Sequence, residues 1–282
     1  MSAEVRRAAV LGHPIAHSLS PVIHRRAYEL LQLAWTYDKV DLTPDQLPQW
    51  LDARDSEWIG VSLTMPLKTD VLPLLDRLDP VVRSTGAANT VIFEPGMRCG
   101  YNTDVEGIVM AVREAVAESE RAQNLACGFD RALVVGAGAT ARSALVAAAD
   151  LGCRSVDVLA RRPEACSDLL TTGAAVGVEP EILPWRDEFE LDYDLVISTV
   201  PAGVADDLVA RVPEWPGVLL DVVYQSWPTP FAQAWTDRGG HAASGLEMLL
   251  HQGVRQISLM TGLDVDPGLI RPTLLAAAGL DG

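Results

Sequence analysis

The glycine-rich segment Gly136–Ala141 is the part of this 282-residue sequence that points most directly to a ligand. It is G-A-G-A-T-A, it follows the apolar run Arg131–Val135, and an alanine-rich stretch comes after it. In a strand-to-helix turn of this kind, Gly136 and Gly138 let the backbone approach a pyrophosphate, which the unpaired N–H groups of a helix starting near Ala139 can bind. The segment predicts a dinucleotide site, and the alternative is a tight turn that binds nothing.

The end of the next expected strand distinguishes between the two nicotinamide dinucleotides. A carboxylate there accepts the ribose 2′-hydroxyl of NAD, whereas arginine accommodates the 2′-phosphate of NADP. The segment Leu159–Pro163 is L-A-R-R-P, and Asp157 falls inside the strand rather than at its end. We therefore predict NADP, with Arg161 and Arg162 on the phosphate and Arg142 as a weaker third partner. The alternative is that these arginines are only solvated.

A lysine at a second turn has the chemistry of a proton donor. Of the 22 basic side chains only Lys39 and Lys68 are lysines, and lysine, unlike arginine, can lose its proton in a protein. Lys68 ends the segment GVSLTMPLK, in which Thr64 and Pro66 indicate a strand-to-helix turn. A cation at a helix start faces the positive end of the helix dipole, which eases proton loss. Lys68 is thus a candidate general acid or a plain surface charge, and Lys39 is expected to be a solvated charge on an edge strand.

Three polar residues, Asn102, Thr103 and Asp104, stand at the start of a long amphipathic segment. An amide, a hydroxyl and a carboxylate at this position are not explained by packing alone. Alternatively, Thr103 and Asp104 only cap the helix and complement its dipole.

The elements that must position these groups follow an α/β pattern, since short apolar runs alternate with helical segments. The polar stretch 120–130 is expected to connect two α/β units. The expected strands are Arg6–Gly12, Ala34–Leu42, Trp58–Leu63, Asn89–Phe93, Arg131–Val135 and Ser155–Ala160, and the expected helices are Pro21–Leu31 with Ser20 as N-cap, Asp104–Glu118 and one running from the glycine turn to Leu151.

Composition excludes several classes of protein. The formal net charge of −16 argues against nucleic acid or an anionic membrane as a partner, and no stretch has the 18 apolar residues of a membrane span. The four cysteines have neither zinc-ligand nor disulfide-framework spacing, which favours a reducing, cytoplasmic setting. The N-terminal histidines straddle a strand end, a loop and a helix, so no metal is expected. The chain is compatible with a monomer or a homodimer.

Several motifs in order resemble the shikimate dehydrogenase family over nearly the full chain. They are GHPIAHSLSP, LTMPLK, GAANT, YNTD, GAGATAR, DVVYQSWPTPF and GLEMLLHQ. The resemblance implies NADPH-dependent, reversible reduction of 3-dehydroshikimate to shikimate in aromatic amino-acid (chorismate) biosynthesis. It also implies two domains: a discontinuous substrate domain, 1–104 with 246–282, and a Rossmann-type, doubly wound NADP domain, 105–245.

The same resemblance implies roles for individual residues. Ser18 and Ser20 would bind the substrate carboxylate together with the N–H groups of the following helix, and Tyr224 would lie near that carboxylate. For Ser20 the alternative is N-capping alone, and for Tyr224 it is packing. Gly245, which opens GLEMLLHQ, would lie on the cofactor.

The ring hydroxyls and the reacting ketone are assigned to a second group of residues. Asn89, Asp104 and Gln252 would bind the hydroxyls, with Thr64 beside them, because each hydroxyl in a buried site needs a matched partner. Lys68 would stabilise the charge that develops on the ketone oxygen and donate the proton, and Asp104 would orient its amine.

Four departures from the family pattern keep alternatives open. Ser62 stands where asparagine is common, Val105 where glycine is common, ARRP replaces Asn-Arg-Thr, and Ser198–Gly203 differs from the commoner loop. One alternative is a quinate/shikimate dehydrogenase that prefers NAD. A second alternative is a sensor of the same fold that binds a shikimate-like acid without turnover. A third is a folate-linked dehydrogenase, which would leave Ser18 and Ser20 unexplained.

Overall fold

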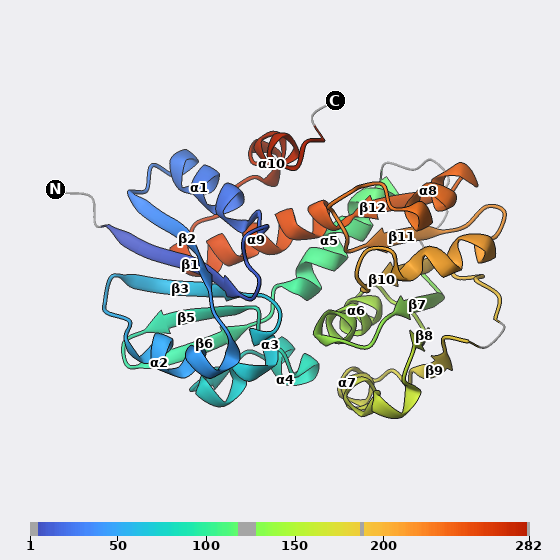
Figure 1. Ribbon diagram of the computed structural model, residues 1–282, viewed down its shortest axis with the longest axis horizontal. Helices are drawn as coiled ribbons and strands as arrows, with labels where there is room; N and C mark the ends of the chain where they lie inside the picture. Colours follow the sequence, from blue (N-terminus) through green and yellow to red (C-terminus); the bar gives the residue numbers. More distant parts are fainter. Residues whose placement is uncertain (1–4, 118–127, 187–188, 281–282) are drawn as a thin grey trace. The chain divides into compact units, whose positions relative to one another are not determined.

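The computed structural model describes residues 5–117, 128–186 and 189–280. The chain divides into two units, each with its own six-stranded sheet (Figure 1). The first unit comprises 1–103 and 249–282, and the second comprises 104–248. The boundaries expected from the family motifs were 104 and 246. Among the described residues, no helix is long and apolar enough to cross a membrane.

The first unit contains a mixed sheet in the order β2-β1-β3-β5-β6-β4. β1 pairs in parallel with β2 and with β3, whereas the pairs β3–β5 and β5–β6 are antiparallel. The strands are β1 (Arg6–Gly12), β2 (Trp35–Asp41), β3 (Trp58–Leu63), β4 (Arg77–Leu78), β5 (Thr90–Glu94) and β6 (Met97–Tyr101).

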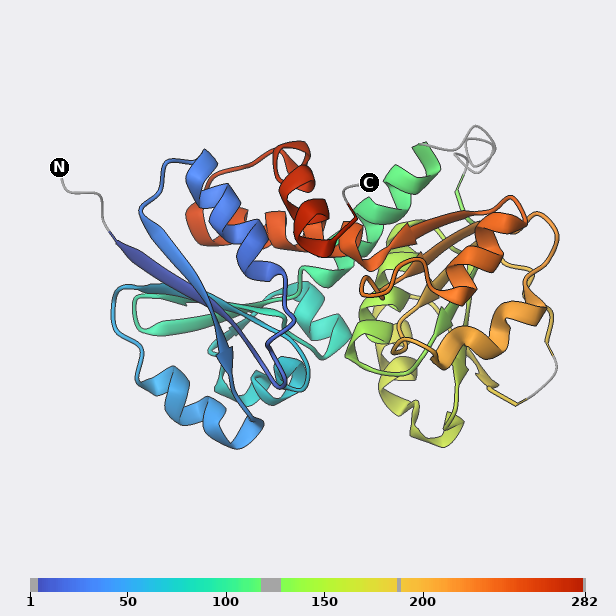
Figure 2. The same cartoon turned by 45° about the horizontal axis from the view of Figure 1, so that its top comes forward.

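Helices cover both faces of this sheet (Figure 2). Because side chains alternate along a strand, Ala9 and Leu11 of β1 face the core beneath α2 and α3, while Ala8 and Val10 face Tyr28 of α1. The helices are α1 (Ser20–Leu30), α2 (Leu47–Asp52), α3 (Leu67–Asp70), α4 (Pro80–Thr85), α9 (Gly245–Thr261), whose first four residues belong to the second unit, and α10 (Arg271–Ala278).

The second unit contains a wholly parallel sheet in the order β12-β11-β10-β7-β8-β9. Numbered from β7, this is 3-2-1-4-5-6 read from the other edge, the doubly wound order of dinucleotide-binding folds. The expected fold class is therefore confirmed. The strands are β7 (Arg131–Val135), β8 (Ser155–Ala160), β9 (Glu181–Pro184), β10 (Leu195–Ser198), β11 (Val218–Asp221) and β12 (His241–Ser244).

The helices of the second unit complete its layers. Phe231 and Trp235 of α8 pack on Leu133 and Val135 of β7, so α8 covers one face of the sheet. Helix α5 contacts β11, β12 and α6, and α6 contacts α7. The helices are α5 (Asp104–Ala117), α6 (Ala139–Asp150), α7 (Ser167–Val176) and α8 (Pro230–Asp237).

Two expectations about the helices near the site differ from the structure, one on the start of α1 and one on the dipole of α3. Helix α1 begins at Ser20, Leu19 occupies its N-cap position, and no side chain caps it there, so Ser20 is not the cap that we predicted. Helix α3 is a single turn of four residues, and its two ends are too close to give Lys68 the dipole environment that we expected. Of the expected connector 120–130, residues 120–127 lie outside the described residues.

Candidate functional site

A buried cluster of amides and hydroxyls lies at the start of β5. The Asn89 amide nitrogen donates to the Thr103 hydroxyl at 2.9 Å and to the Gln252 carbonyl oxygen at 3.2 Å. Its own carbonyl oxygen accepts from the Thr103 N–H at 2.9 Å and from the Thr90 hydroxyl at 2.8 Å. All four residues are at most 7 % exposed. Burying so many polar atoms is costly unless they are paired, and here they are paired with one another.

This cluster brings together two predicted site residues that are 163 positions apart, Asn89 and Gln252. It also fixes the backbone just before Asp104, because the Thr103 N–H is held by Asn89. Asp104 itself is buried and is the first residue of α5. Helix capping alone does not account for Thr103, because its hydroxyl is hydrogen-bonded to Asn89 and Gln252.

The segment before α1, which carries Ser18, is hydrogen-bonded to the edge strand β2. The Ser18 hydroxyl accepts from the Ser20 N–H at 3.3 Å, and Ser20 is buried in the first turn of α1. Lys39 is exposed on β2 as predicted, but it is more than a solvated charge, because its ammonium donates to the Ala16 carbonyl at 2.6 Å. The carboxylate of Asp41, on the same strand, lies 2.6 Å from the His13 ring nitrogen Nδ1.

The hydrogen bond to the His13 ring is the main reason why the pKa of Asp41 lies below its usual range. The carboxylate of Asp41 also accepts from the Ile15 N–H at 3.4 Å. The edge strand therefore anchors both ends of the segment that leads to the two serines.

The turn that carries Lys68 follows β3. The Thr64 N–H donates to the Leu11 carbonyl at 2.9 Å, and the Lys68 carbonyl accepts from the Ala88 N–H at 2.8 Å. The second contact ties the backbone of Lys68 to the residue before Asn89. Thr64 and Lys68 are both half-buried, which leaves each side chain access to a ligand.

The glycine turn has the geometry of a nucleotide site. Gly136 has φ of 116°, and a Cβ atom there would lie 2.5 Å from the Thr199 hydroxyl, so only glycine fits. Gly138 is the N-cap of α6, Ala139 is its first residue, and no atom lies within 4 Å of a Cβ built on Gly138. The turn lies where β7 and β10 meet and the strand order reverses, the place where doubly wound sheets bind ligands.

At the end of β8 two arginines are exposed, and within the described parts of the chain neither Arg161 nor Arg162 has an ion-pair partner. Asp157 lies inside the strand as predicted, and its carboxylate accepts from the Tyr193 hydroxyl at 2.7 Å. Arg142 instead forms an ion pair with Asp168 at 2.7 Å, so the Asp168 carboxylate would compete with a cofactor phosphate for its guanidinium group.

Two further predicted residues lie at the end of β11. Tyr224 is half-buried in the loop that follows the strand, and burial raises its pKa. Gly245 opens α9, and its N–H donates to the Val223 carbonyl at 3.2 Å. A Cβ atom on Gly245 would overlap the Val222 carbonyl, which accounts for the glycine by backbone packing alone.

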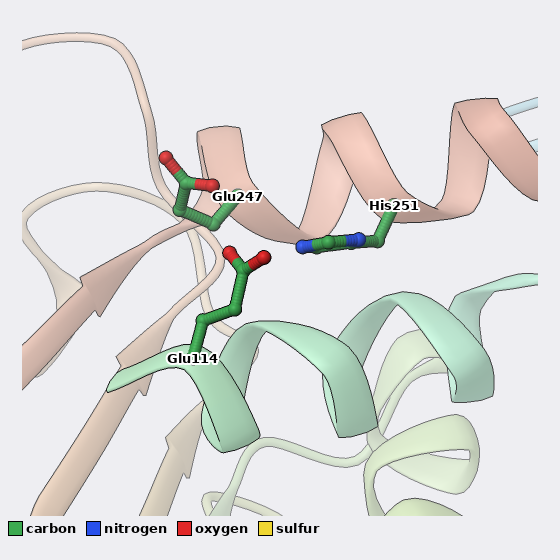
Figure 3. A group of neighbouring side chains, drawn as sticks. All are labelled: Glu114, Glu247 and His251. Atoms are coloured by element: carbon green, nitrogen blue, oxygen red, sulfur yellow. The ribbon is translucent and has the colours of Figure 1, made fainter. Parts of the chain in front are cut away.

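One further group has metal-ligand chemistry. Glu114 of α5 points toward α9, where Glu247 and His251 lie one turn apart, and one ligand atom of each of the three residues lies within 4.8 Å of the others (Figure 3). Both glutamates are half-buried, and none of the predicted site residues belongs to this group.

Two residues that the sequence pattern did not indicate as part of the site, His24 and Gln256, extend the amide cluster. The Gln256 amide nitrogen donates to the Gln252 carbonyl oxygen at 3.0 Å, and the Gln256 carbonyl oxygen lies 3.2 Å from His24 Nε2. From the sequence alone, His24 was weighed only as a metal ligand. The spacing of Gln252 and Gln256 by one helical turn was the available signal. The departure Ser62 is also explained structurally, since its hydroxyl is hydrogen-bonded to Tyr37.

Comparison with known proteins agrees with these features. Residues 10–91 match the profile of the shikimate dehydrogenase substrate binding domain, and residues 245–275 match that of the shikimate 5′-dehydrogenase C-terminal domain. A protein of Desulforamulus reducens named shikimate dehydrogenase (NADP(+)) is 32% identical over 94% of this chain and 93% of its own.

Solved structures resemble the chain over a similar extent. The shikimate dehydrogenase of Mycobacterium tuberculosis has a TM-score of 0.84 and 35% identity, covering 96% of this chain and 99% of that one. The Thermus thermophilus shikimate 5-dehydrogenase, solved with NADP(H) and shikimate, has a TM-score of 0.80 and 32% identity, with the same coverage. The chain belongs to the shikimate dehydrogenase family.

Proposed function

We propose that this protein catalyses the NADPH-dependent, reversible reduction of 3-dehydroshikimate to shikimate, a step of aromatic amino-acid biosynthesis. The main support for the proposal is the buried amide cluster of Asn89 and Gln252 in the first unit. The turn that carries Lys68 is hydrogen-bonded to Ala88, the residue before Asn89. Family membership supplies the substrate class.

The substrate is held by groups of complementary chemistry. Ser18 and Ser20, at the start of α1, bind the carboxylate through their hydroxyl groups, which explains how so acidic a protein takes an anion. Asn89, Gln252 and Thr64 bind the ring hydroxyls, and Tyr224 lies near the carboxylate. A substrate lacking one of these hydroxyls would lose the hydrogen bond that this hydroxyl makes to the site, and this gives the site its selectivity.

The reacting carbonyl is served by Lys68 and Asp104. The Lys68 ammonium stabilises negative charge on the carbonyl oxygen and donates the proton that makes it a hydroxyl. The Asp104 carboxylate accepts from a ring hydroxyl of the substrate, and its position is set by the Thr103 backbone that Asn89 holds.

The second unit holds the nucleotide, and the residues present fit NADP. Gly136, Gly138 and the α6 N-terminus at Ala139 hold the pyrophosphate, and exposed Arg161 and Arg162 hold the 2′-phosphate. Gly245 packs the start of α9 against the backbone beside the cofactor. Bound NADPH supplies the hydride for the reduction.

The division of labour between the two units is part of the same proposal: the first binds substrate and the second binds the nucleotide. We also assign the enzyme to the cytoplasm, because Cys99, Cys153 and Cys166 are free and buried. Its partners are small molecules rather than nucleic acid, in keeping with the charge of −16.

The test is the nicotinamide absorbance of purified protein mixed with NADPH and 3-dehydroshikimate. A decrease that depends on both compounds and on enzyme concentration supports the proposal. Binding of shikimate, measured by calorimetry, without any absorbance change would instead identify a ligand sensor of the same fold.

A further inference from the structure

The amide cluster continues beyond the residues that would touch a substrate. From Gln252, a hydrogen bond leads to Gln256 one turn along α9, and a second leads from Gln256 to His24 on α1 at 3.2 Å. Gln256 and His24 are at most 1 % exposed. Since neither can reach solvent, their polar atoms are served by the cluster alone or by near neighbours.

The direction of each bond follows from the donor and acceptor inventory. The Gln256 amide nitrogen donates to the Gln252 carbonyl oxygen at 3.0 Å, so the Gln256 carbonyl oxygen is the atom that faces His24. His24 Nε2 must therefore carry the proton, which leaves Nδ1 toward the Tyr28 hydroxyl at 3.4 Å. Burial lowers the pKa of His24 to about 3, so the ring stays neutral and keeps this tautomer.

The His24 ring is itself held in place. It stacks on Tyr37 with ring centroids 3.8 Å apart and an interplanar angle of 14°, and the Tyr37 hydroxyl is hydrogen-bonded to Ser62 of β3. The donor that faces Gln256 is thus fixed by the sheet as well as by α1.

These contacts leave Gln252 only one orientation. Its carbonyl oxygen accepts from Asn89 at 3.2 Å and from Gln256 at 3.0 Å, and one amide hydrogen goes to the Leu249 carbonyl at 3.2 Å. A flipped amide would direct its nitrogen at two donors and lose both bonds. The amide nitrogen is therefore the end of Gln252 that can meet a ligand.

We propose that Gln256 and His24 are positioning residues, which lock the Gln252 carboxamide so that it offers an N–H donor, and not its carbonyl, to a substrate hydroxyl. The inference rests on the proposed function for the identity of that substrate. It adds two residues to the determinants of specificity, neither of which touches the ligand.

The experiment compares Gln256→Leu, Gln252→Leu and the double variant, with steady-state kinetics for shikimate and NADP and calorimetric shikimate binding. Loss of the orienting bond in Gln256→Leu is expected to raise the KM and Kd for shikimate roughly fivefold to tenfold, with kcat and the KM for NADP little changed. In the Gln252→Leu background the same substitution should add almost nothing, because Gln256 acts through Gln252.

Tyr28→Phe is the matched control, because it also removes a buried polar atom next to His24 but leaves the Gln256 bond intact. It should keep the wild-type KM for shikimate. Effects of Gln256→Leu and Gln252→Leu that simply add, or an unchanged shikimate affinity in Gln256→Leu, would overturn the inference. Wild-type protein that binds shikimate without turnover would contradict the proposed function alone, whereas wild-type protein that does not bind shikimate would contradict both.

Discussion

Lys68 carries the chemical step of the proposed reaction, and its surroundings differ from those expected. The predicted advantage of a helix dipole is lost, because α3 is a single turn. What the structure offers is a backbone anchor, the hydrogen bond from the Ala88 N–H to the Lys68 carbonyl at 2.8 Å. The lysine is thus placed by the same segment that carries Asn89.

Replacing Lys68 tests its role directly. Lys68→Ala should lower kcat by roughly 10²–10⁴, the usual contribution of a positioned acid, with a small change in the KM for shikimate. Lys68→Arg should also be impaired, because a guanidinium does not give up its proton. Steady-state assays measure both, and an Arg variant with near-wild-type turnover would remove proton donation from the role of Lys68.

In the proposed reaction, the arginine pair after β8 selects the cofactor. Replacing Arg161 and Arg162 with alanine should raise the KM for NADPH far more than that for NADH, since only NADPH has the 2′-phosphate. Arg154→Ala, which removes an exposed arginine from the other end of the same strand, is the control. Equal effects on the two cofactors would contradict the assignment.

His24 should make the stability of the protein depend on pH. Its pKa is lowered from 6.5 to about 3 by burial, so between these values the unfolded chain binds a proton that the folded chain does not. Stability is therefore fully retained above pH 6.5 and falls as the solution is acidified, by about 1.4 kcal/mol per pH unit well below 6.5.

Urea unfolding of the wild type and His24→Gln between about pH 7 and pH 5, a window that spans the onset of this protonation, checks the prediction. The variant will be less stable throughout, but its stability should fall less steeply with acidification. Parallel curves would show that His24 is not a buried neutral imidazole.

Residue chemistry was predictable from the sequence only where it depends on local pattern. Asp157 lies inside β8, as the sequence pattern predicted, and its carboxylate accepts a hydrogen bond from the Tyr193 hydroxyl. Lys39 was predicted to be solvated and instead holds the Ala16 carbonyl, a contact between β2 and a loop 23 residues away that no local pattern encodes.

At the scale of elements, the glycine turn after β7 is the most constrained feature. Gly136→Ala should weaken NADP binding strongly, because the new Cβ meets the Thr199 hydroxyl at 2.5 Å and φ is 116°. The control is Gly96→Ala, where φ is 72° but no atom lies within 4 Å of the Cβ. It bears a similar backbone cost of about 1–2 kcal/mol and should leave the KM for NADP unchanged. NADP titration that finds similar affinities in both variants would contradict the site.

Strands were predicted better than helix starts. The ranges of β1, β3, β7 and β8 agree with the sequence pattern because each is an apolar run bounded by polar or glycine residues. The predicted start of α1 was wrong by one residue: Leu19 is at the N-cap without a side-chain cap, and the serine that was expected there lies in the first turn.

At the scale of the whole molecule, the site depends on chain segments that the sequence does not show as neighbours. Asn89 meets Gln252 across 163 positions, and His24 meets Gln256 across 232. Family resemblance indicated Asn89 and Gln252, but their donor and acceptor directions follow only from the three-dimensional contacts. The fold class, in contrast, was predictable, because the alternation of strands and helices is a property of the whole sequence.

Values of kcat/KM for shikimate and for quinate, each with NADP and with NAD, test whether this chain acts as the proposed NADP-dependent shikimate dehydrogenase. We expect shikimate with NADP to give the highest of these values, because the proposed phosphate partners Arg161 and Arg162 favour the phosphorylated cofactor. A highest value for quinate with NAD would contradict it.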